Sequence, residues 1–518
     1  MRRREFIQCM LPLAGTPLVF PMWSTKKLFG APPKLRKFSG IPDDGRVLVL
    51  VQLAGGNDGL NTVIPYQHDN YYNSRPVLGI TQNRIMDING ELGFHPQFSG
   101  MHDLYQEGKL AVVQGVGYDN PNRSHFKSTD IWMTASDSDD LKDTGWLGRY
   151  FDQVCPPAED GGSTCETTGP PAIQIGLTSS LALLGKNPKG ISLQDPISFY
   201  NLVTRGDAHG GDPSVEPKTA AERELFFLRD TAASAFEYAG DILGAFDQSQ
   251  NTVNYPEESL AAQLSIVARL ISGGLSTRVF IVSIKGFDTH AAQQGVHDTL
   301  LSNVSRAISV FQQDIENQGL ADRVLGMCFS EFGRRVQENG SAGTDHGTAA
   351  PMFLFGRPAL GGLHGPHPGM APDQLISGDI RHQFDFRQVY ATVLSQWLGA
   401  PDVNQILGSG FEQLPLIDPT TNISEEGQIL PDDYFLAQNY PNPFNPTTTI
   451  QYRLPETAEI ELSVFNALGR KIQTLFKGRQ TAGSHRVIWD ARGNASGTYF
   501  LRMRGRGIEL ARAMQLLK

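Results

Sequence analysis

Carboxylates and imidazoles flank the apolar runs of this chain, at the points where those runs meet polar loops. In chain order they are Asp58, Asp288, His290, Glu331, Asp345 and His346. Because parallel strands of an α/β sheet end at one shared edge, side chains that follow several strands meet there. Carboxylate oxygens and imidazole nitrogens are ordinary ligands of divalent metals. We therefore expect one shared metal site, with Asp288, His290 and His346 as its central members.

A serine opens a helix-like segment in the same pattern. Ser124 follows the apolar run at 110–116 and precedes the segment 125–134. The N-terminal amides of a helix can receive an anionic oxygen, so a hydroxyl in this place could act as a nucleophile. The alternative is a helix cap, the commonest role of a serine before a helix.

Structural alternatives stay open for the other residues. Asp58 lies in Gly-Gly-Asn-Asp-Gly, where it could shape a turn. Glu331 could form a buried ion pair with Arg334 or Arg335. The histidines expected at the surface are His95, His102, His364 and His367.

Apolar runs alternate with helix-like segments from residue 46 to about 415, which predicts a three-layer α/β body with a mainly parallel sheet. Residues 416–434 are rich in Pro, Asp, Glu, Thr and Asn and fit a linker. Beyond them, 435–518 alternate apolar and polar residues at period two, with turn residues between the runs. This pattern predicts a small all-β, Ig-like sandwich.

Composition limits the partners. The chain has 518 residues and 40% hydrophobic content, enough for a large core and a smaller one. The net charge of the chain is −10. Residues 1–37 and 435–518 each carry +7, so residues 38–434 carry −24. An acidic body argues against a nucleic-acid surface, which needs cations to neutralise phosphates.

The first 30 residues predict an export signal. Arg3-Arg4 before Phe6-Ile7 favours the twin-arginine type over an ordinary secretory signal. The apolar stretch that follows is too short to cross a bilayer, so we expect no transmembrane segment in the mature chain. In an oxidising compartment Cys155 and Cys165 could form a disulfide, and Cys328 is expected to be buried and inert.

The C-terminal segment resembles a sorting domain. The motif Tyr-Pro-Asn-Pro-Phe-Asn-Pro at 440–446, with Phe-Asn-Ala-Leu-Gly-Arg at 465–470 and Ser-Gly-Thr-Tyr-Phe at 496–500, is similar to the type A sorting domain of the type IX secretion system. This resemblance covers 435–518. It implies that the partners include the export and outer-membrane secretion machinery, and that the protein is cell-surface or secreted.

The body resembles the domain of unknown function 1501 family over about 46–412. Four segments carry the resemblance, at 53–66, 122–126, 286–290 and 330–347. That family is in turn similar to the alkaline phosphatase and sulfatase superfamily, which implies an alkaline-phosphatase-like fold and a divalent-metal hydrolase of phosphate or sulfate esters. The metal would be zinc, manganese, calcium or magnesium.

The resemblance also implies roles for single residues. They are Ser124 as nucleophile, Asp58 as first carboxylate, Asp288, His290 and His346 on one metal, Glu331 on a second, and Asp345 as an alternative ligand. Where the superfamily shows Asp-His or Asp-Asn, this chain has Glu331-Phe332. That departure favours an alternative, a non-catalytic surface or envelope binding protein that retains the fold.

Overall fold

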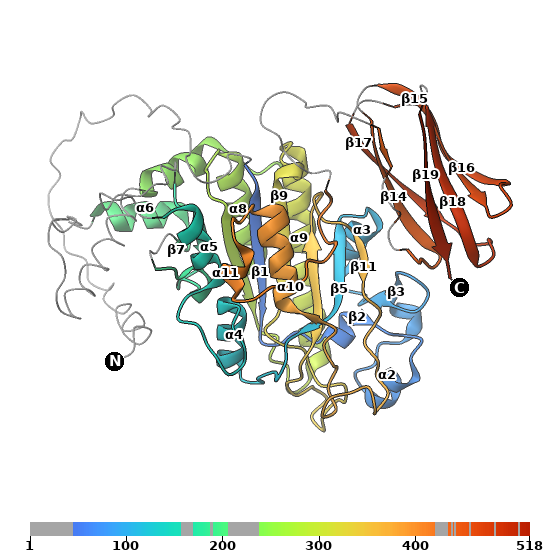
Figure 1. The fold of residues 1–518 in the computed structure, drawn as a ribbon. Helices are drawn as coiled ribbons and strands as arrows, with labels where there is room; N and C mark the ends of the chain where they lie inside the picture. The colour runs from blue at the N-terminus through green and yellow to red at the C-terminus, as the bar shows by residue number, and fades with distance from the viewer. Residues whose placement is uncertain are drawn as a thin grey trace. The chain divides into compact units, whose positions relative to one another are not determined.

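The computed structural model describes residues 45–156, 169–186, 190–205, 238–419 and most of 434–517. The expected export signal and most of the expected linker lie outside these residues. The α/β body and the C-terminal β-region are described separately below (Figure 1).

A nine-stranded sheet forms the middle layer of the body. Its order is β11-β5-β10-β9-β1-β8-β6-β7, and β12 pairs with β5. The bounds are β1 Val47–Ala54, β5 Leu110–Gly117, β6 Ala172–Ile175, β7 Gly190–Leu193, β8 Val279–Lys285, β9 Val324–Phe329, β10 Ala350–Phe355, β11 Gly362–His364 and β12 Phe384–Asp385. Within the described sheet, β10 runs antiparallel to both of its neighbours, whereas the other pairs are parallel. The expected mainly parallel sheet is confirmed.

Helices cover both faces of this sheet (Figure 1). Alternate residues of β1 show why, since Val49 and Val51 join one apolar core while Leu48 and Leu50 join the other. The first core is covered by α3 (Ser99–Gln106), α8 (Ser259–Ser272) and α9 (Gln293–Asn317). The second is covered by α4 (His125–Thr134), α5 (Trp146–Val154) and α10 (Phe386–Thr392). The expected three-layer arrangement is therefore confirmed.

The carboxyl ends of β1, β5, β8 and β9 meet at one edge, and β10 begins there because it runs in the opposite direction. The turn after β1 comes very close to the loop after β8. Gly55 has a φ of +122°, and a Cβ built on it would lie 2.5 Å from the backbone nitrogen of Asp288. Glycine is required here both by the conformation and by the space.

The C-terminal region is an antiparallel all-β unit, as expected. Its two sheets have the orders β13-β14-β17 and β16-β15-β18-β19. The bounds are β13 Phe435–Leu436, β14 Thr447–Leu454, β15 Ala458–Asn466, β16 Lys471–Gln480, β17 Gly483–Asp490, β18 Gly497–Gly505 and β19 Ile508–Leu516. Trp489, Leu462 and Leu501 are buried in a core of its own.

The cysteines divide as the sequence suggested where they are described. Cys155 is disulfide-bonded, and its expected partner Cys165 lies outside the described residues. Cys328 is a buried free thiol whose pKa is raised by burial, which keeps it protonated and inert. Within the described part of the chain, every helix is too short or too polar to span a bilayer.

Candidate metal centre

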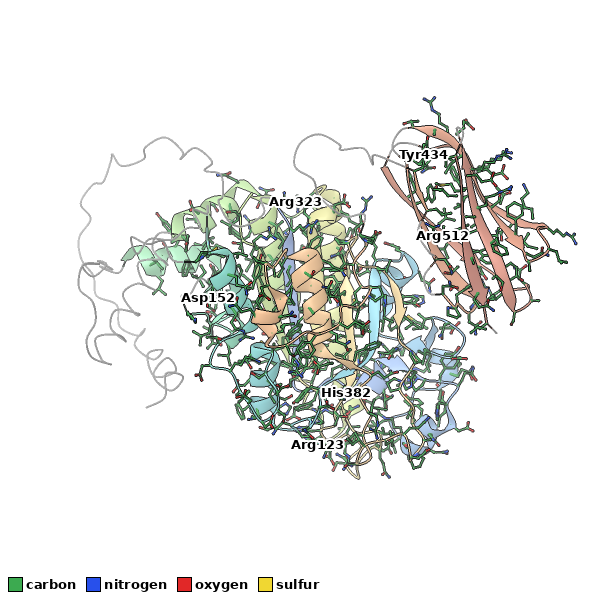
Figure 2. The ribbon with its side chains drawn as sticks, viewed as in Figure 1. Arg123, Asp152, Arg323, His382, Tyr434 and Arg512 are labelled. Carbon is green, nitrogen blue, oxygen red and sulfur yellow. The ribbon has the colours of Figure 1, made fainter. Side chains whose placement is uncertain are left out.

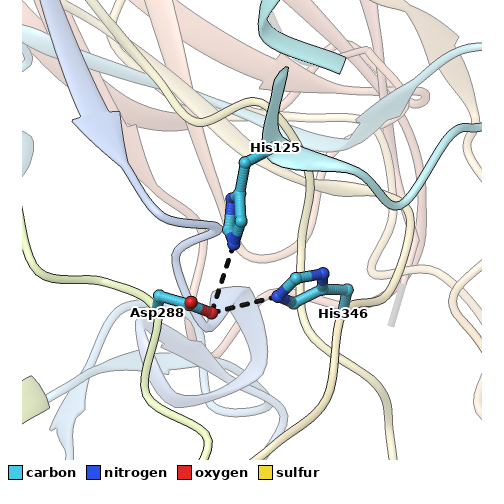
Figure 3. A group of neighbouring side chains, drawn as sticks. All are labelled: His125, Asp288 and His346. Carbon is cyan, nitrogen blue, oxygen red and sulfur yellow. Dashed lines mark hydrogen bonds and ion pairs between the residues drawn. The ribbon is translucent and has the colours of Figure 1, made fainter. Parts of the chain in front are cut away.

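Three imidazole rings converge on one carboxylate oxygen at the carboxyl edge of the sheet. Figure 3 shows two of them, His125 and His346, with Asp288. The Nε2 atoms of His125, His290 and His346 lie 3.2, 3.0 and 3.0 Å from Oδ1 of Asp288. The Nε2 atoms of His290 and His346 are 2.9 Å apart. The structure thus brings together the three residues that the sequence placed at the centre of a metal site, and adds His125 to them.

Each of the three rings is held by an acceptor at its other nitrogen. The pairs are His125 Nδ1 with Glu331 Oε1 (2.8 Å), His290 Nδ1 with Asp345 Oδ1 (3.1 Å) and His346 Nδ1 with the carbonyl oxygen of Arg123 (2.7 Å). An acceptor at Nδ1 assigns the ring proton to that nitrogen. The Nε2 lone pairs are then directed at the common centre, which is how metal-binding histidines are usually oriented.

The donor atoms also have a spacing that fits one ion. Ligands about 2.0–2.1 Å from a tetrahedral zinc ion lie about 3.3 Å from one another. One ligand atom from each of His125, Asp288 and His346, two nitrogens and one oxygen in all, lie within 4.8 Å of one another. The Nε2 atom of His125 is buried without a hydrogen-bond partner among the described residues, since its 3.2 Å approach to Asp288 lacks hydrogen-bond alignment. A bound cation would satisfy this nitrogen, so the residues fit a metal.

Asp288 is fixed in its ionised form by a buried arginine. Nη2 of Arg334 lies 2.8 Å from Oδ1 of Asp288, and the Arg334 side chain is fully buried. Burial raises the pKa of Asp288, but Arg334, through its hydrogen bond and its positive charge, is the main group that lowers it, and the net pKa lies well below its usual range. The remaining Arg334 donors reach backbone carbonyls, including those of Gly55 and Gly56. Asp288 therefore presents a negative oxygen in a defined position.

Glu331 stands behind His125, and its Oε1 atom also accepts a hydrogen bond of 2.8 Å from the backbone nitrogen of Gly55. The hydrogen bond to Glu331 raises the pKa of His125, so a proton competes with a metal for this ring. The sequence predicted a ligand role or an ion pair with Arg334 or Arg335. In the structure these arginines pair with Asp288 and Asp379 instead, and Glu331 orients His125.

Asp58 is engaged elsewhere. Its Oδ2 atom lies 2.6 Å from Nη1 of Arg75, and both side chains are buried. Burial raises the pKa of Asp58, and the neighbouring Arg75 lowers it by more, so the net shift is downward. Its other oxygen caps the 3₁₀ turn Gly59–Asn61 through the backbone nitrogen of Asn61. This geometry gives Asp58 a buried ion pair in place of the expected ligand role.

Ser124 occupies the N-cap position of α4 and is exposed, but its side chain makes no capping hydrogen bond. The structural alternative of a side-chain cap is therefore not realised. Its two neighbours both belong to the centre, because the Arg123 carbonyl holds His346 and His125 supplies a ring nitrogen. Ser124 therefore lies between two residues that contact the cluster.

Phe332 lies beside two of the rings. Its buried ring packs against the rings of His125 and His346, with centroids 4.9 and 4.8 Å away. The side chain that follows Glu331 therefore presents an apolar surface to the cluster, without a ligand atom.

His125 was not predicted among the ligands. The signal that could have found it was its place beside Ser124, directly after the strand β5.

Two histidines that we expected at the surface are buried. His95 is 1% exposed and lies 3.0 Å from Oδ1 of Asp298. His364 is 2% exposed, and its Nε2 donates to the carbonyl oxygen of Leu360 at 2.7 Å. Both predictions were wrong. Nδ1 of His95 accepts from the backbone nitrogen of Gln97 at 3.1 Å and His364 has its carbonyl acceptor, and such internal partners offset the cost of leaving water.

Comparisons with known proteins agree with the two-part organisation. A family model described as "Protein of unknown function (DUF1501)" matches residues 46–400, and a "Secretion system C-terminal sorting domain" matches 438–514. The sorting domain indicates secretion by the type IX system to the cell surface or the extracellular space. No curated protein matches the chain.

Several solved structures show a distant likeness. A Bacteroides thetaiotaomicron protein described in connection with the metabolism of multiple glycosaminoglycans is 11% identical, with 83% of this chain and 89% of that chain covered and a TM-score of 0.35. A Pseudoalteromonas sulfatase is 9% identical, with coverage of 87% and 84% and a TM-score of 0.29. An alkaline phosphatase variant is 12% identical, with coverage of 56% and 63% and a TM-score of 0.26. Likeness at this level carries no argument about activity.

Proposed function

The chain belongs to the DUF1501 family of proteins of unknown function, and we propose that its body is a secreted, metal-dependent hydrolase of sulfate or phosphate esters. The observation that carries this proposal is the orientation of three imidazole rings. Each has its Nδ1 atom held from outside and its Nε2 atom directed at Asp288. Three lone pairs and a carboxylate facing one another repel in the absence of a cation, so a bound ion explains why they are so arranged.

The donor set favours a borderline metal. His125, His290, His346 and Asp288 offer three nitrogens and one oxygen, which suits zinc and also manganese. Calcium and magnesium prefer sites made of oxygen alone, so they fit less well. When bound, such an ion supplies Lewis-acid stabilisation of the negative charge that builds up on an ester during hydrolysis.

The chain's own groups divide the remaining work. We assign the attack on the sulfur or phosphorus of the ester to the Ser124 hydroxyl, which is exposed at the start of α4 and lies beside two residues of the centre. The bond to the alcohol breaks as the new bond forms, the hydroxyl proton passes to the leaving alcohol, and water then hydrolyses the serine ester and restores the hydroxyl. The backbone N–H groups of the first turn of α4 would receive the anionic oxygens of the ester. Arg334 keeps Asp288 ionised and in place, and Glu331 and Asp345 keep the rings of His125 and His290 in the required tautomer.

Export is the second part of the proposal. We propose that residues 1–30 act as a twin-arginine signal, and that the partners are the export and outer-membrane secretion machinery. The sorting domain at 438–514 supports passage through the outer membrane.

An alternative is a surface protein that keeps this fold and binds ligands without turnover. The apolar ring of Phe332 against His125 and His346 favours it, since Phe332 offers no ligand atom for a second ion. Metal content with no turnover of any ester would support this alternative.

Elemental analysis of the purified chain tests the proposal, together with hydrolysis of p-nitrophenyl sulfate and p-nitrophenyl phosphate. We expect one equivalent of zinc or manganese and hydrolysis that a chelator abolishes. His125→Ala should lose the metal and the activity, whereas His102→Ala, a change outside the centre, should lose neither. A chain that carries no metal after purification and takes up none on dialysis against zinc or manganese would refute the metal centre.

A further inference from the structure

Two arginines flank the metal centre and share one buried carboxylate. Arg123 donates from Nη2 to Oδ2 of Asp379, and Nε of Arg335 lies 3.3 Å from Oδ1 of the same residue. The Asp379 side chain is fully buried, but the side chains of Arg123 and Arg335 are 41% and 39% exposed. The carboxylate therefore anchors the two guanidinium groups from the interior of the protein, and part of each arginine side chain stays exposed to solvent.

The backbone is shaped to hold this pair. Ile376 and Asp379 exchange two backbone hydrogen bonds around Ser377 and Gly378, whose φ angles of +53° and +83° form a tight turn. The carbonyl of Ser377 accepts a hydrogen bond of 2.8 Å from Nη2 of Arg335. A Cβ at Gly378 would come within 3.0 Å of the same nitrogen, so the glycine leaves room for the guanidinium.

The two arginines are close in sequence to residues of the metal centre and are hydrogen-bonded to it through their main chains. The carbonyl of Arg123 holds the ring of His346, and the backbone nitrogen of Arg335 donates to the carbonyl of Asp345 at 3.0 Å. Figure 2 shows Arg123 at the end of the body opposite to Arg323, which precedes β9, and therefore at the carboxyl edge of the sheet. The side chain of Arg123 turns to Asp379, whereas its main chain faces the imidazole cluster.

The two guanidinium groups share one carboxylate, and donors remain. Burial raises the pKa of Asp379, although Arg123 and Arg335 both lower it. A guanidinium has five N–H donors, and the contacts within the described residues use one nitrogen of Arg123 and two of Arg335. The exposed carboxylate in this loop, Asp345, is engaged by His290 and Asn339.

We propose that Arg123 and Arg335 form an anion subsite beside the metal centre, which binds a sulfate, phosphate or carboxylate group. Guanidinium forks bind such oxyanions with two parallel hydrogen bonds. The assignment of this anion to a second charged group of the ester substrate rests on the proposed function, whereas anion binding itself does not. The preferred substrate would then be a multiply charged ester in place of a simple one.

Sulfate binding to the full-length chain tests this proposal. Sodium sulfate is titrated against the chain at constant ionic strength set with sodium chloride, in the presence of a chelator, and the dissociation constant is taken from the rise of the melting temperature. We expect a saturable rise for the natural chain. Arg123→Gln and Arg335→Gln should each weaken sulfate binding about tenfold or more, and Arg335→Lys should weaken it less than Arg335→Gln because the charge remains.

Arg357→Gln is the matched control. Arg357 is 63% exposed, pairs with Asp322, and follows β10, at the opposite edge of the sheet. The Arg357→Gln variant should bind sulfate with the same affinity as the natural chain. Unchanged sulfate affinity in both glutamine variants would overturn the subsite, as would a sulfate effect no larger than that of chloride. A sulfate effect that is seen only when the chelator is left out would also overturn it, because the anion would then bind to the metal.

The same measurement separates the two proposals. If the chain takes up no metal but still binds sulfate through these arginines, the anion subsite is supported and the metal-dependent hydrolase is refuted.

Discussion

Replacing Glu331 by glutamine should weaken metal binding through His125 without removing a ligand. Glu331 is 2% exposed, and its Oε1 atom accepts from His125 Nδ1 and from the backbone nitrogen of Gly55, both at 2.8 Å. A glutamine oxygen can keep the Gly55 bond. The substitution removes the negative charge of Glu331. That charge stabilises the proton on Nδ1 of His125 and makes Nε2 a better electron donor to a metal.

The size of the effect follows from the role of Glu331 as the partner that orients a ligand. Removing a partner that orients a metal-binding histidine costs 10- to 100-fold in affinity, about 1.4–2.7 kcal/mol at one decade per 1.4 kcal/mol. Loss of His125 itself should cost more, because a donor atom disappears. Competition with a chromophoric zinc chelator measures both affinities on one scale.

Two outcomes would refute this reasoning. Unchanged affinity in Glu331→Gln, beside a clear loss in His125→Ala, would show that Glu331 does not act through the ring. A loss as large as that of Asp288→Ala would show that Glu331 is itself a ligand, as the sequence predicted. Glu338→Gln is the control, since Glu338 also accepts a backbone hydrogen bond, from Leu78 at 2.7 Å, and lies outside the cluster.

The remaining predictions concern other parts of the chain. Asp288→Ala and His346→Ala should each remove the metal in elemental analysis, and the double variant should lose little more, because members of one site are not additive. Asp58→Asn leaves a buried arginine unpaired and should lower the unfolding free energy by about 3–5 kcal/mol in urea denaturation, with metal content retained; loss of metal from a folded chain would restore Asp58 as a ligand. Burial lowers the pKa of His364 to about 4, below the unfolded value of about 6.5, so the unfolded chain binds the extra proton between these values and stability falls as the pH drops through that window. His364→Gln should flatten the fall by up to about 1.4 kcal/mol per pH unit, and an unchanged slope in urea denaturation would contradict this. Deletion of 435–518 should trap the protein in the periplasm, and cell fractionation that still finds it on the surface would refute the sorting role.

Strand ends could be predicted from the sequence, and they carried most of the site. Apolar runs that end in Asp288 and precede His346 place both residues at one edge of a mainly parallel sheet, although 58 positions separate them. The structure brings their side chains to within hydrogen-bond distance. This inference needs only the order of strands and their direction.

The sequence could not predict which side chains of these loops reach the cluster. Whether His125 or Glu331 faces Asp288 depends on how far each side chain reaches from its loop, which no spacing pattern encodes. Asp58 is diverted by Arg75, 17 residues later, which becomes buried only when the intervening loop folds back. A buried carboxylate such as Asp58 needs a positively charged or hydrogen-bonding partner, but only the tertiary fold determines that this partner is Arg75.

The imidazole rings of the centre are each held by a loop other than their own. His125 follows β5 and is held from the loop after β9; His346 precedes β10 and is held from the loop after β5; His290 follows β8 and is held from the loop before β10. The loop after β5 and the loop between β9 and β10 are thus interlocked, since each holds a ring that the other carries, and the second also holds the ring of His290. Local fluctuations should then open the whole edge as a single cooperative unit, with similar amide exchange protection in all of these loops. A graft of any one loop onto a related body would carry a ring without its anchor, so these segments can diverge only together.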